Sequence, residues 1–123
     1  MKSRILDASV WVEYFADRPK ASLVEPLVSD PSSVIVPAVV LYEVYKRIKV
    51  GIGDDAAEAA IGRMLLSEVV ALDCDLALQA ADVSVFDRLA MADAMILATA
   101  RAYGAELVTL DADFKNVPGA RVL

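Results

Sequence analysis

Two kinds of apolar pattern alternate along the chain. Short runs rich in Val, Ile and Leu favour buried strands, and we expect these at SRILD (3–7), SVIVP (33–37), VVALD (69–73), ELVTL (106–110) and ARVL (120–123). Longer segments between the runs have helical character, with apolar residues spaced to match. They predict helices at 8–16, 20–28, 37–50, 54–68, 75–88 and 92–103, the third opened by Pro37 and the last closed by Gly104.

This order of elements predicts the fold. Strands that are separated by helices form a parallel sheet covered on both faces, with right-handed crossovers. A chain of 123 residues without an internal repeat, a low-complexity tract or a linker fits one domain with one core. We therefore expect a single-domain α/β protein over residues 1–123, a three-layer α/β/α sandwich with a mainly parallel central sheet.

Composition narrows the chemistry. With 58% hydrophobic residues and few Gly and Pro, the chain has the composition of a compact globular protein. The single Cys74 cannot form an internal disulfide, which favours a reducing, intracellular setting, and we expect this residue to be buried. The absence of His excludes Ser-His-Asp and Cys-His catalysis and His-rich zinc sites.

Charge and hydropathy bear on location and partners. Asp7 and Glu13 interrupt the apolar segment that a signal peptide would need, and no apolar run approaches the ~20 residues that span a bilayer. We therefore expect a cytoplasmic protein with no membrane partner. The net charge of -6 argues against binding nucleic acid by bulk electrostatics. Contact with phosphate would need a local basic patch or bound cations.

Four acidic residues are predicted to meet at one edge of the sheet. Asp7 ends the first strand and Asp111 ends the fourth, and ligand sites of parallel sheets form at these carboxyl ends. Glu43 lies two turns into the helix after the second strand, and Asp93 lies in the first turn of the last predicted helix. All four carboxylates can therefore converge.

Most of these acids also have a purely structural explanation. Asp7 could cap the following helix by accepting a hydrogen bond from the Ser9 or Val10 amide. Asp93 suits the positive end of a helix dipole. The two aspartates of the segment LDADF could be turn residues, which accept hydrogen bonds from nearby backbone amides.

Glu43 is harder to explain in this way. An exposed pair with Arg47 would contribute only about 0.2–0.5 kcal/mol, and the apolar residues around Glu43 predict a helix that is buried on most sides. A buried carboxylate needs a strong partner. If the carboxylates lie about 6 Å apart at an effective dielectric near 20, each pair repels by roughly 3 kcal/mol. Cations must offset this repulsion, and oxygen ligands without His or thiolate suit Mg²⁺ or Mn²⁺.

Several motifs, in their order along the chain, resemble one family. The chain has LDASVW (6–11), a Glu in the helix after VIVP, and ADAMILATA (92–100) followed by YGAELVTLDADF (103–114). Over nearly its whole length it resembles PIN domains, and most of all the VapC ribonuclease toxins of toxin/antitoxin pairs. The resemblance implies a PIN-like nuclease domain that hydrolyses RNA phosphodiester bonds with divalent metal and leaves 5′-phosphate and 3′-hydroxyl ends. It also implies a homodimer and a VapB-like antitoxin whose basic residue enters the acidic site.

The resemblance assigns site residues as well. The acidic quartet that holds one or two Mg²⁺ or Mn²⁺ ions is matched by Asp7, Glu43, Asp93 and Asp111. Ser9 and Thr109 match hydroxyl residues beside the first and last acids, although each could equally be a capping or strand-end hydroxyl. Asp113 matches an acid whose part varies. Because TLDADF is a residue shorter than one common version of this motif, either Asp111 or Asp113 could be the metal ligand.

A short basic segment follows Glu43. Its cations Lys46, Arg47 and Lys49 could contact RNA backbone, or they could lie on a solvated helix face. Trp11 belongs to a largely apolar segment, so we expect it in the core or at an interface and not as a platform for base stacking.

Three other functions are compatible with parts of this pattern. A PIN-like nuclease of RNA maturation or DNA processing would use the same acids, although this short chain lacks the extra helices expected for threading a DNA flap. A catalytically inactive PIN-like scaffold would gain nothing from mutually repelling acids. A signalling receiver could use Asp73 as its acceptor, but it would need a Lys at the end of the fifth strand, where ARVL has none.

Overall fold

Five short strands form the centre of the molecule, which a computed structural model describes over residues 3–123. In chain order they are β1 (Arg4–Leu6), β2 (Val34–Pro37), β3 (Glu68–Val70), β4 (Glu106–Thr109) and β5 (Ala120–Val122). All neighbouring strands pair in parallel, in the order β3-β2-β1-β4-β5. The predicted parallel sheet is confirmed, and β1 lies at its centre.

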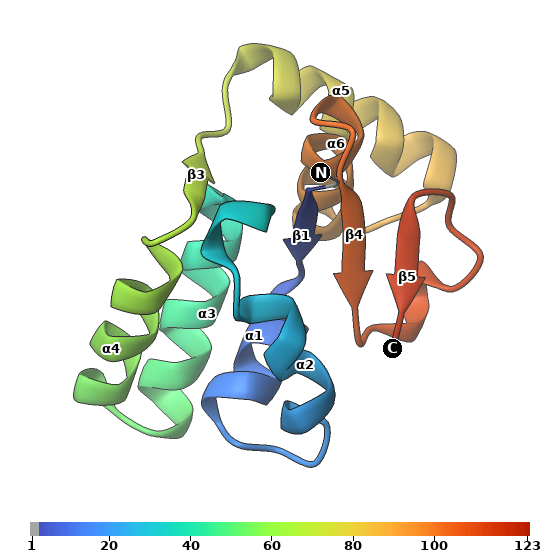
Figure 1. Cartoon of the computed structure of the whole chain (residues 1–123). Helices are drawn as coiled ribbons and strands as arrows, with labels where there is room; N and C mark the ends of the chain where they lie inside the picture. Colours follow the sequence, from blue (N-terminus) through green and yellow to red (C-terminus); the bar gives the residue numbers. More distant parts are fainter. Residues whose placement is uncertain (1–2) are drawn as a thin grey trace.

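Helices connect the strands and cover both faces of the sheet. They are α1 (Ala8–Phe15), α2 (Ala21–Val28), α3 (Ala38–Gly51), α4 (Asp54–Met64), α5 (Cys74–Asp87) and α6 (Met91–Ala102), with short 3-10 turns η1 (Pro31–Ser33) and η2 (Ala112–Phe114). The chain runs from β1 to β2 and β3 and then returns across the sheet to β4. Right-handed crossovers therefore place α5 and α6 on the face opposite α1, and Figure 1 shows α6 behind β1 and β4. The expected three-layer α/β/α architecture is confirmed.

The core packs on the central strands. Leu6 and Leu107 are fully buried on the neighbouring strands β1 and β4, and burying a side chain of this size stabilises the fold by about 1.5–3 kcal/mol. Trp11 is buried as expected and stacks on Phe15, with ring centroids 5.7 Å apart. α6 is buried on most sides, and Gly104 follows it with a φ of 61°, which suits a residue just past a helix end.

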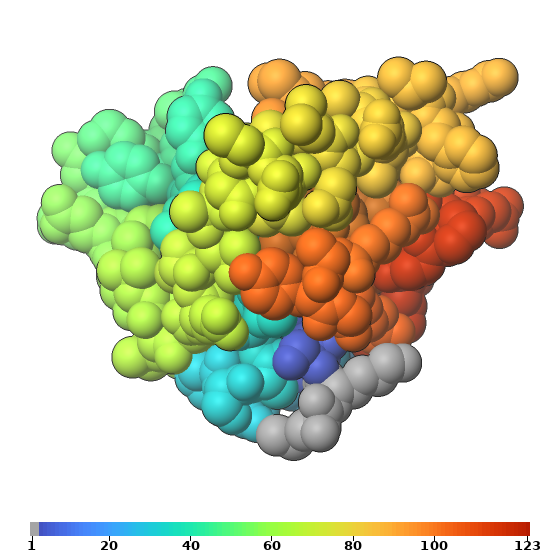
Figure 2. Space-filling model, turned by 90° about the horizontal axis from the view of Figure 1, so that it is seen from above, coloured from blue at the N-terminus to red at the C-terminus, as the bar shows by residue number. Residues whose placement is uncertain are grey.

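The outer surface is formed mainly by the helices. Figure 2 looks at the amino ends of the strands and shows α5, in yellow, as a ridge along one side of the molecule. Among the residues that the structure describes, no helix has both the length and the apolar character needed to cross a bilayer.

Several element ends differ from the prediction. The third strand ends at Val70 and not at residue 73, because Asp73 caps α5 by accepting a hydrogen bond of 2.8 Å from the Leu76 amide. The fourth helix ends at Met64 because the chain turns there to enter β3. Pro37 does not open α3 but ends β2, since its ψ of 141° is extended while its φ of -61° would suit either element.

Two predictions of burial are wrong. Cys74 is exposed, because it begins α5 at the surface. α3 is not buried on most sides: its buried residues Val40, Val44 and Ile48 recur every four positions and form one stripe, whereas Tyr42 is 62% exposed. The apolar sequence around Glu43 therefore reflects partly exposed side chains, and Glu43 itself is half-buried.

The strand order creates one crevice at the edge of the sheet. The chain leaves β1 towards β2 on one side, whereas the strand on the other side, β4, is reached later from α6. The strand order therefore changes direction at β1 and β4. In such sheets, ligand sites form outside the carboxyl ends of the strands at this change of direction. Asp7 directly follows β1, and Asp111 lies two residues after β4. The fold therefore brings the first and the last predicted acid to the same crevice.

Candidate metal centre

Asp7 is a buried carboxylate with hydrogen bonds to both of its oxygens. Oδ1 accepts a bond of 2.8 Å from the Ala8 amide. Oδ2 accepts bonds from the Thr109 hydroxyl at 2.8 Å and from the Ser9 hydroxyl at 3.1 Å. The predicted helix cap is present, but its donor is Ala8 and not Ser9 or Val10, because the Val10 amide donates to the backbone oxygen of Asp7 at 3.0 Å.

Ser9 and Thr109 connect the two segments that flank the crevice. The Ser9 hydroxyl accepts a bond of 3.1 Å from the Leu110 amide, and the Thr109 hydroxyl accepts one of 2.9 Å from the Asp111 amide. Each hydroxyl therefore receives a backbone bond from the segment after β4 and donates to the same Asp7 oxygen. This arrangement fixes the Asp7 carboxylate relative to the segment that carries Asp111.

Three aspartates form a close group near Asp7, although the group itself includes neither Asp7 nor Glu43. Asp93, Asp111 and Asp113 each offer a carboxylate oxygen, and these oxygens lie within 4.8 Å of one another. Asp93 lies in the first turn of α6, and Asp111 caps η2 by accepting a bond of 2.9 Å from the Asp113 amide. Asp111 is half-buried and Asp113 is exposed, so both acids that the sequence offered at this position lie within reach of Asp93.

Glu43 approaches the same site from α3. Its Oε1 atom is buried and has no hydrogen-bond partner among the described residues. The predicted alternative, an ion pair with Arg47, is not among the ion pairs found within residues 3–123. A buried carboxylate oxygen without a partner is costly unless another group satisfies it.

Burial and like charges act together on two of these carboxyl groups. The pKa of Asp93 is raised to about 6, first by burial and then by the charges of Asp7 and the two aspartates near η2. The pKa of Glu43 is also raised, first by burial and then by Asp7 and Asp93, while Arg47 acts in the opposite direction. Acids from four separate segments of the chain therefore share one electrostatic site.

The donor set fits a divalent cation. All of the candidate ligands are carboxylates, which hard ions such as Mg²⁺ prefer, and the Glu43 Oε1 atom is left without a partner inside the described part of the chain. A cation would offset the repulsion that raises the pKa of Asp93 and would satisfy that oxygen. The residues that could hold it are Asp7, Glu43, Asp93 and Asp111, with Asp113 as the alternative to Asp111.

The three predicted basic contacts differ in their surroundings. Lys46 and Arg47 are exposed on α3, one turn beyond Glu43. Lys49 pairs instead with Asp54, with Nζ 2.9 Å from Oδ1. Sequence reasoning missed Arg18, which lies near Lys46 and Arg47 although it follows α1. Only tertiary structure reveals this neighbour, since Arg18 belongs to a turn without any motif.

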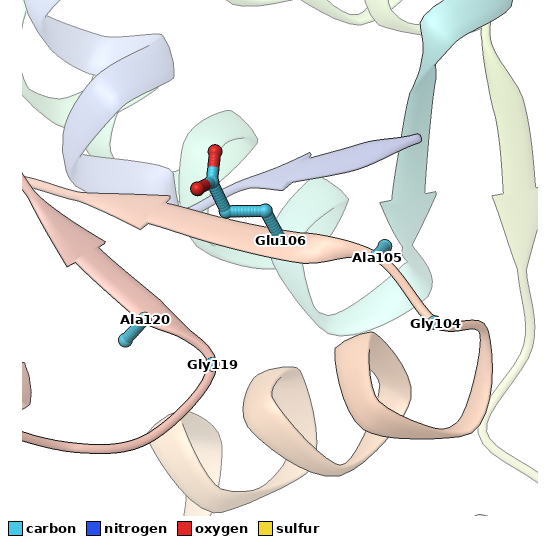
Figure 3. A pocket seen from close by; sticks show the side chains of 5 residues that line it. All are labelled: Gly104, Ala105, Glu106, Gly119 and Ala120. Atoms are coloured by element: carbon cyan, nitrogen blue, oxygen red, sulfur yellow. The ribbon is translucent and has the colours of Figure 1, made fainter. Parts of the chain in front are cut away.

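A second hollow lies at the opposite edge of the sheet (Figure 3). It has a volume of about 280 Å³ and lies at the amino ends of β4 and β5. Its lining consists of small residues and Glu106, whose carboxylate pairs with Arg121 at 3.3 Å. Because sites of parallel sheets form at the carboxyl ends of the strands, this hollow is the weaker candidate.

Comparison with known proteins identifies a matching family model. The model for the PIN domain matches residues 4–120, which is most of the chain. Among curated proteins, no relative matches the sequence.

Solved structures share the fold over nearly their whole length. A chain of a toxin-antitoxin complex from Klebsiella pneumoniae has a TM-score of 0.81 and 23% identity, covering 98% of this chain and 97% of that chain. A VapC toxin from Mycobacterium tuberculosis that cleaves the sarcin-ricin loop has a TM-score of 0.80 and 25% identity, covering 95% and 96%. A chain of DNA-bound VapBC from Salmonella typhimurium has a TM-score of 0.79 and 19% identity, covering 100% and 98%.

Proposed function

Because the chain belongs to the PIN domain family, we propose that it is a metal-dependent endoribonuclease and the toxin of a VapBC-type toxin/antitoxin pair. One observation carries the proposal: the oxygens of three aspartates from α6 and η2 lie within 4.8 Å of one another, and the charges of Asp7 and Glu43 belong to the same electrostatic site. The Glu43 Oε1 atom there has no partner among residues 3–123. PIN nucleases use divalent metal ions. A binding scaffold without an ion would gain nothing from this repulsion.

The proposed ligands of one or two Mg²⁺ or Mn²⁺ ions are Asp7, Glu43, Asp93 and Asp111, with Asp113 as the alternative to Asp111. A bound ion would activate a water molecule and neutralise charge on the phosphodiester. Ser9 and Thr109 orient the Asp7 carboxylate through its Oδ2 atom, so they are positioning residues. Glu43 and Asp93 hold protons more readily than ordinary carboxyls when no cation is bound, because the pKa of each is raised.

RNA is the proposed substrate, cleaved by hydrolysis to 5′-phosphate and 3′-hydroxyl ends. Support comes from the Mycobacterium tuberculosis toxin, which shares 25% of its sequence with this chain and cleaves the sarcin-ricin loop. A substrate of this kind also implies a cytoplasmic site of action.

The proposed partners are a VapB-like antitoxin and a second copy of the chain. The antitoxin is supported by neighbours solved as toxin-antitoxin or VapBC complexes. The homodimer is supported by apolar side chains on the outer side of α5: Leu78, Val85 and Phe86 are 70%, 83% and 86% exposed. Exposed apolar side chains gathered in this way mark surfaces that bind another protein.

A cleavage assay tests the enzymatic proposal. Structured and unstructured RNAs are incubated with the protein and Mg²⁺ or Mn²⁺, beside Asp7→Asn and beside wild type in excess chelator. Cleavage that requires both the metal and Asp7 supports the proposal, and undiminished cleavage in chelator contradicts it.

Growth of cells tests the biological role. Expression of wild type alone should arrest growth, Asp7→Asn should not, and co-expression of an antitoxin encoded beside the toxin should restore growth. Strong expression of a folded, RNA-cleaving protein without any effect on growth would contradict the toxin role and favour an enzyme of RNA maturation.

A further inference from the structure

A basic cleft lies between the end of α1 and the C-terminal half of α3. It has a volume of about 300 Å³, and its lining residues are Val12, Arg18, Lys46, Arg47, Val50 and Gly51. Three of these residues are cations from two separate parts of the chain, and the lining contains no carboxylate among the described residues. The cleft is therefore locally positive on a protein whose net charge is -6.

The cations of the basic cleft are available to a ligand. Within the part of the chain that the structure describes, the ion pairs are Lys49–Asp54, Arg101–Asp87 and Arg121–Glu106. Arg18, Lys46 and Arg47 take part in none of them. Lys46 does lie near Tyr42, with Nζ 3.5 Å from the phenolic oxygen, but this contact leaves its charge uncompensated. The positive charge of the cleft therefore faces solvent.

The basic cleft adjoins the carboxylate site along the same two helices. On α3, Lys46 and Arg47 follow Glu43 by three and four residues, so all three side chains lie on one face about one turn apart. On α1, Asp7 caps the first turn and Val12 lines the cleft. A ligand that extends between these helices would meet the carboxylates with one group and the cations with the next.

We propose that the basic cleft binds a backbone phosphate of the RNA substrate next to the phosphate that is cleaved, an inference that rests on the proposed function. Arg18 and Arg47 have planar guanidinium groups that can donate paired hydrogen bonds to phosphate oxygens, and Lys46 adds a point charge. Such contacts read no base, so they position RNA regardless of its sequence. They also offset the repulsion between the RNA backbone and the acidic site.

RNA suits this position better than an acidic protein segment does. The phosphate that is cleaved must lie at the carboxylate site, and each further nucleotide brings another phosphate at a regular interval. A strand that leaves the site between α1 and α3 therefore reaches the basic cleft without any further recognition element. An acidic peptide would have to be brought there by separate contacts.

The test compares Gln substitutions at Arg18, Lys46 and Arg47, singly and together, with wild type. Arg121→Gln is the control, because it makes the same charge change in an exposed surface pair at the far edge of the sheet. Rates are measured on an RNA oligonucleotide and on bis(p-nitrophenyl) phosphate, a small phosphodiester that has no neighbouring phosphate. Melting temperatures establish that each variant is folded.

The triple variant should raise KM for RNA about tenfold while kcat changes little, since charge-assisted contacts to a flanking phosphate are lost. The slope of log KM against log salt concentration should fall by about 0.7 for each phosphate contact removed. Cleavage of the small phosphodiester by Arg18→Gln and Lys46→Gln should match wild type, whereas Arg47 also acts on the pKa of Glu43 and is judged by KM for RNA and the salt slope. Arg18→Gln and Lys46→Gln alone should each raise KM for RNA by a smaller factor, so the single variants test the proposal even if the triple variant does not fold.

Three outcomes would overturn the inference. Unchanged KM and salt slope in a folded triple variant would remove the cleft from RNA binding while leaving the nuclease intact. A poly-glutamate peptide that binds wild type but not the triple variant, with an unchanged KM for RNA, would assign the cleft to a protein partner. Failure of wild type to cleave either substrate with Mg²⁺ or Mn²⁺ would instead remove the proposed function, and the cleft's role with it.

Discussion

The Thr109 hydroxyl donates a hydrogen bond of 2.8 Å to Oδ2 of Asp7, joining two residues that lie 102 positions apart in the chain. Both are buried, with Thr109 fully inaccessible to solvent. A buried hydrogen bond to a charged group contributes about 1.5–3 kcal/mol, more than one between neutral groups. The same bond sets the orientation of the Asp7 carboxylate, so it links the stability of the fold to the geometry of the site.

Thr109→Val should impair both properties. Val keeps the shape of the side chain but removes the hydroxyl, so we expect a loss of about 1–3 kcal/mol in the free energy of unfolding. Cleavage should fall about 10- to 100-fold, because outer hydrogen bonds orient metal ligands. Thr109→Ser restores the hydroxyl and should recover most of the activity. Denaturant unfolding and RNA cleavage rates measure the two effects, and a Val variant as active as wild type would show that Thr109 does not position Asp7.

Substitution of the proposed ligands should abolish most of the activity. Asp7→Asn, Glu43→Gln and Asp93→Asn are each expected to lower the RNA cleavage rate at least about a hundredfold, since each removes a carboxylate that would hold the ion. Asp82→Asn changes an exposed carboxylate on α5 and is the matched control, with a rate near that of wild type. If two of the three ligand variants cleave at the wild-type rate, the assignment of the site is wrong.

Asp93→Asn should raise the melting temperature of the metal-free protein. The substitution keeps the shape of the side chain and relieves repulsion from Asp7, Asp111 and Asp113. It loses a favourable interaction with the helix dipole of about 0.3–1 kcal/mol, which we expect the relief to exceed. Mg²⁺ or Mn²⁺ should then stabilise wild type more than the variant, because an ion that binds only the folded state adds stability according to its affinity.

Thermal unfolding of both proteins, with metal and with chelator, measures this difference. A variant that is clearly less stable than wild type in chelator, together with no effect of metal on wild type, would make Asp93 a structural residue of α6.

The difference in melting temperature between metal-free Asp93→Asn and wild type should depend on pH. The pKa of Asp93 is raised to about 6 in the folded protein, so the folded state holds this proton more tightly than the unfolded state does. The stability from this proton is fully present below about pH 4 and is lost as pH rises through about 6, because stability falls where the folded state binds more protons. In chelator, the melting temperature of wild type should therefore drop below that of the variant as the pH rises from about 4 to 6. Above about pH 6, the difference between the two melting temperatures should stay constant. Melting temperatures across this range measure the gap, and a gap that is the same at pH 4 and pH 7 would contradict the assignment.

Much of the site could be predicted because parallel α/β folds place strand ends together. Asp7 and Asp111 follow buried apolar runs, so a reading of the strands was enough to bring them to one edge. Glu43 was singled out because its neighbours are apolar, although α3 is buried along one stripe and not on most sides. Its Oε1 atom, which has no partner within residues 3–123, fits that choice. The metal-binding and catalytic roles of these residues remain predictions.

Other features could not be predicted because they depend on contacts between distant elements. Nothing in the sequence places Arg18 beside Lys46. Local spacing also does not show that Lys49 forms an ion pair with Asp54, which lies across the turn into α4. Cys74 was expected to be buried because free cysteines usually are, but its position at the start of α5 exposes it. The spacing of apolar residues locates helices and strands well, whereas the partners of a surface cation depend on how those helices and strands pack.

The strand order also determines when the site can come into existence during synthesis. The central strand β1 is synthesised well before its neighbour β4 and before the acids of α6 and η2. The first 92 residues contain Asp7 and Glu43 but neither Asp93 nor Asp111. Since chains are synthesised at about 5–20 residues per second, several seconds separate translation of the first acid from the last. A nascent or prematurely terminated chain of that length therefore carries Asp7 and Glu43 but lacks the acids of α6 and η2 that complete the proposed site.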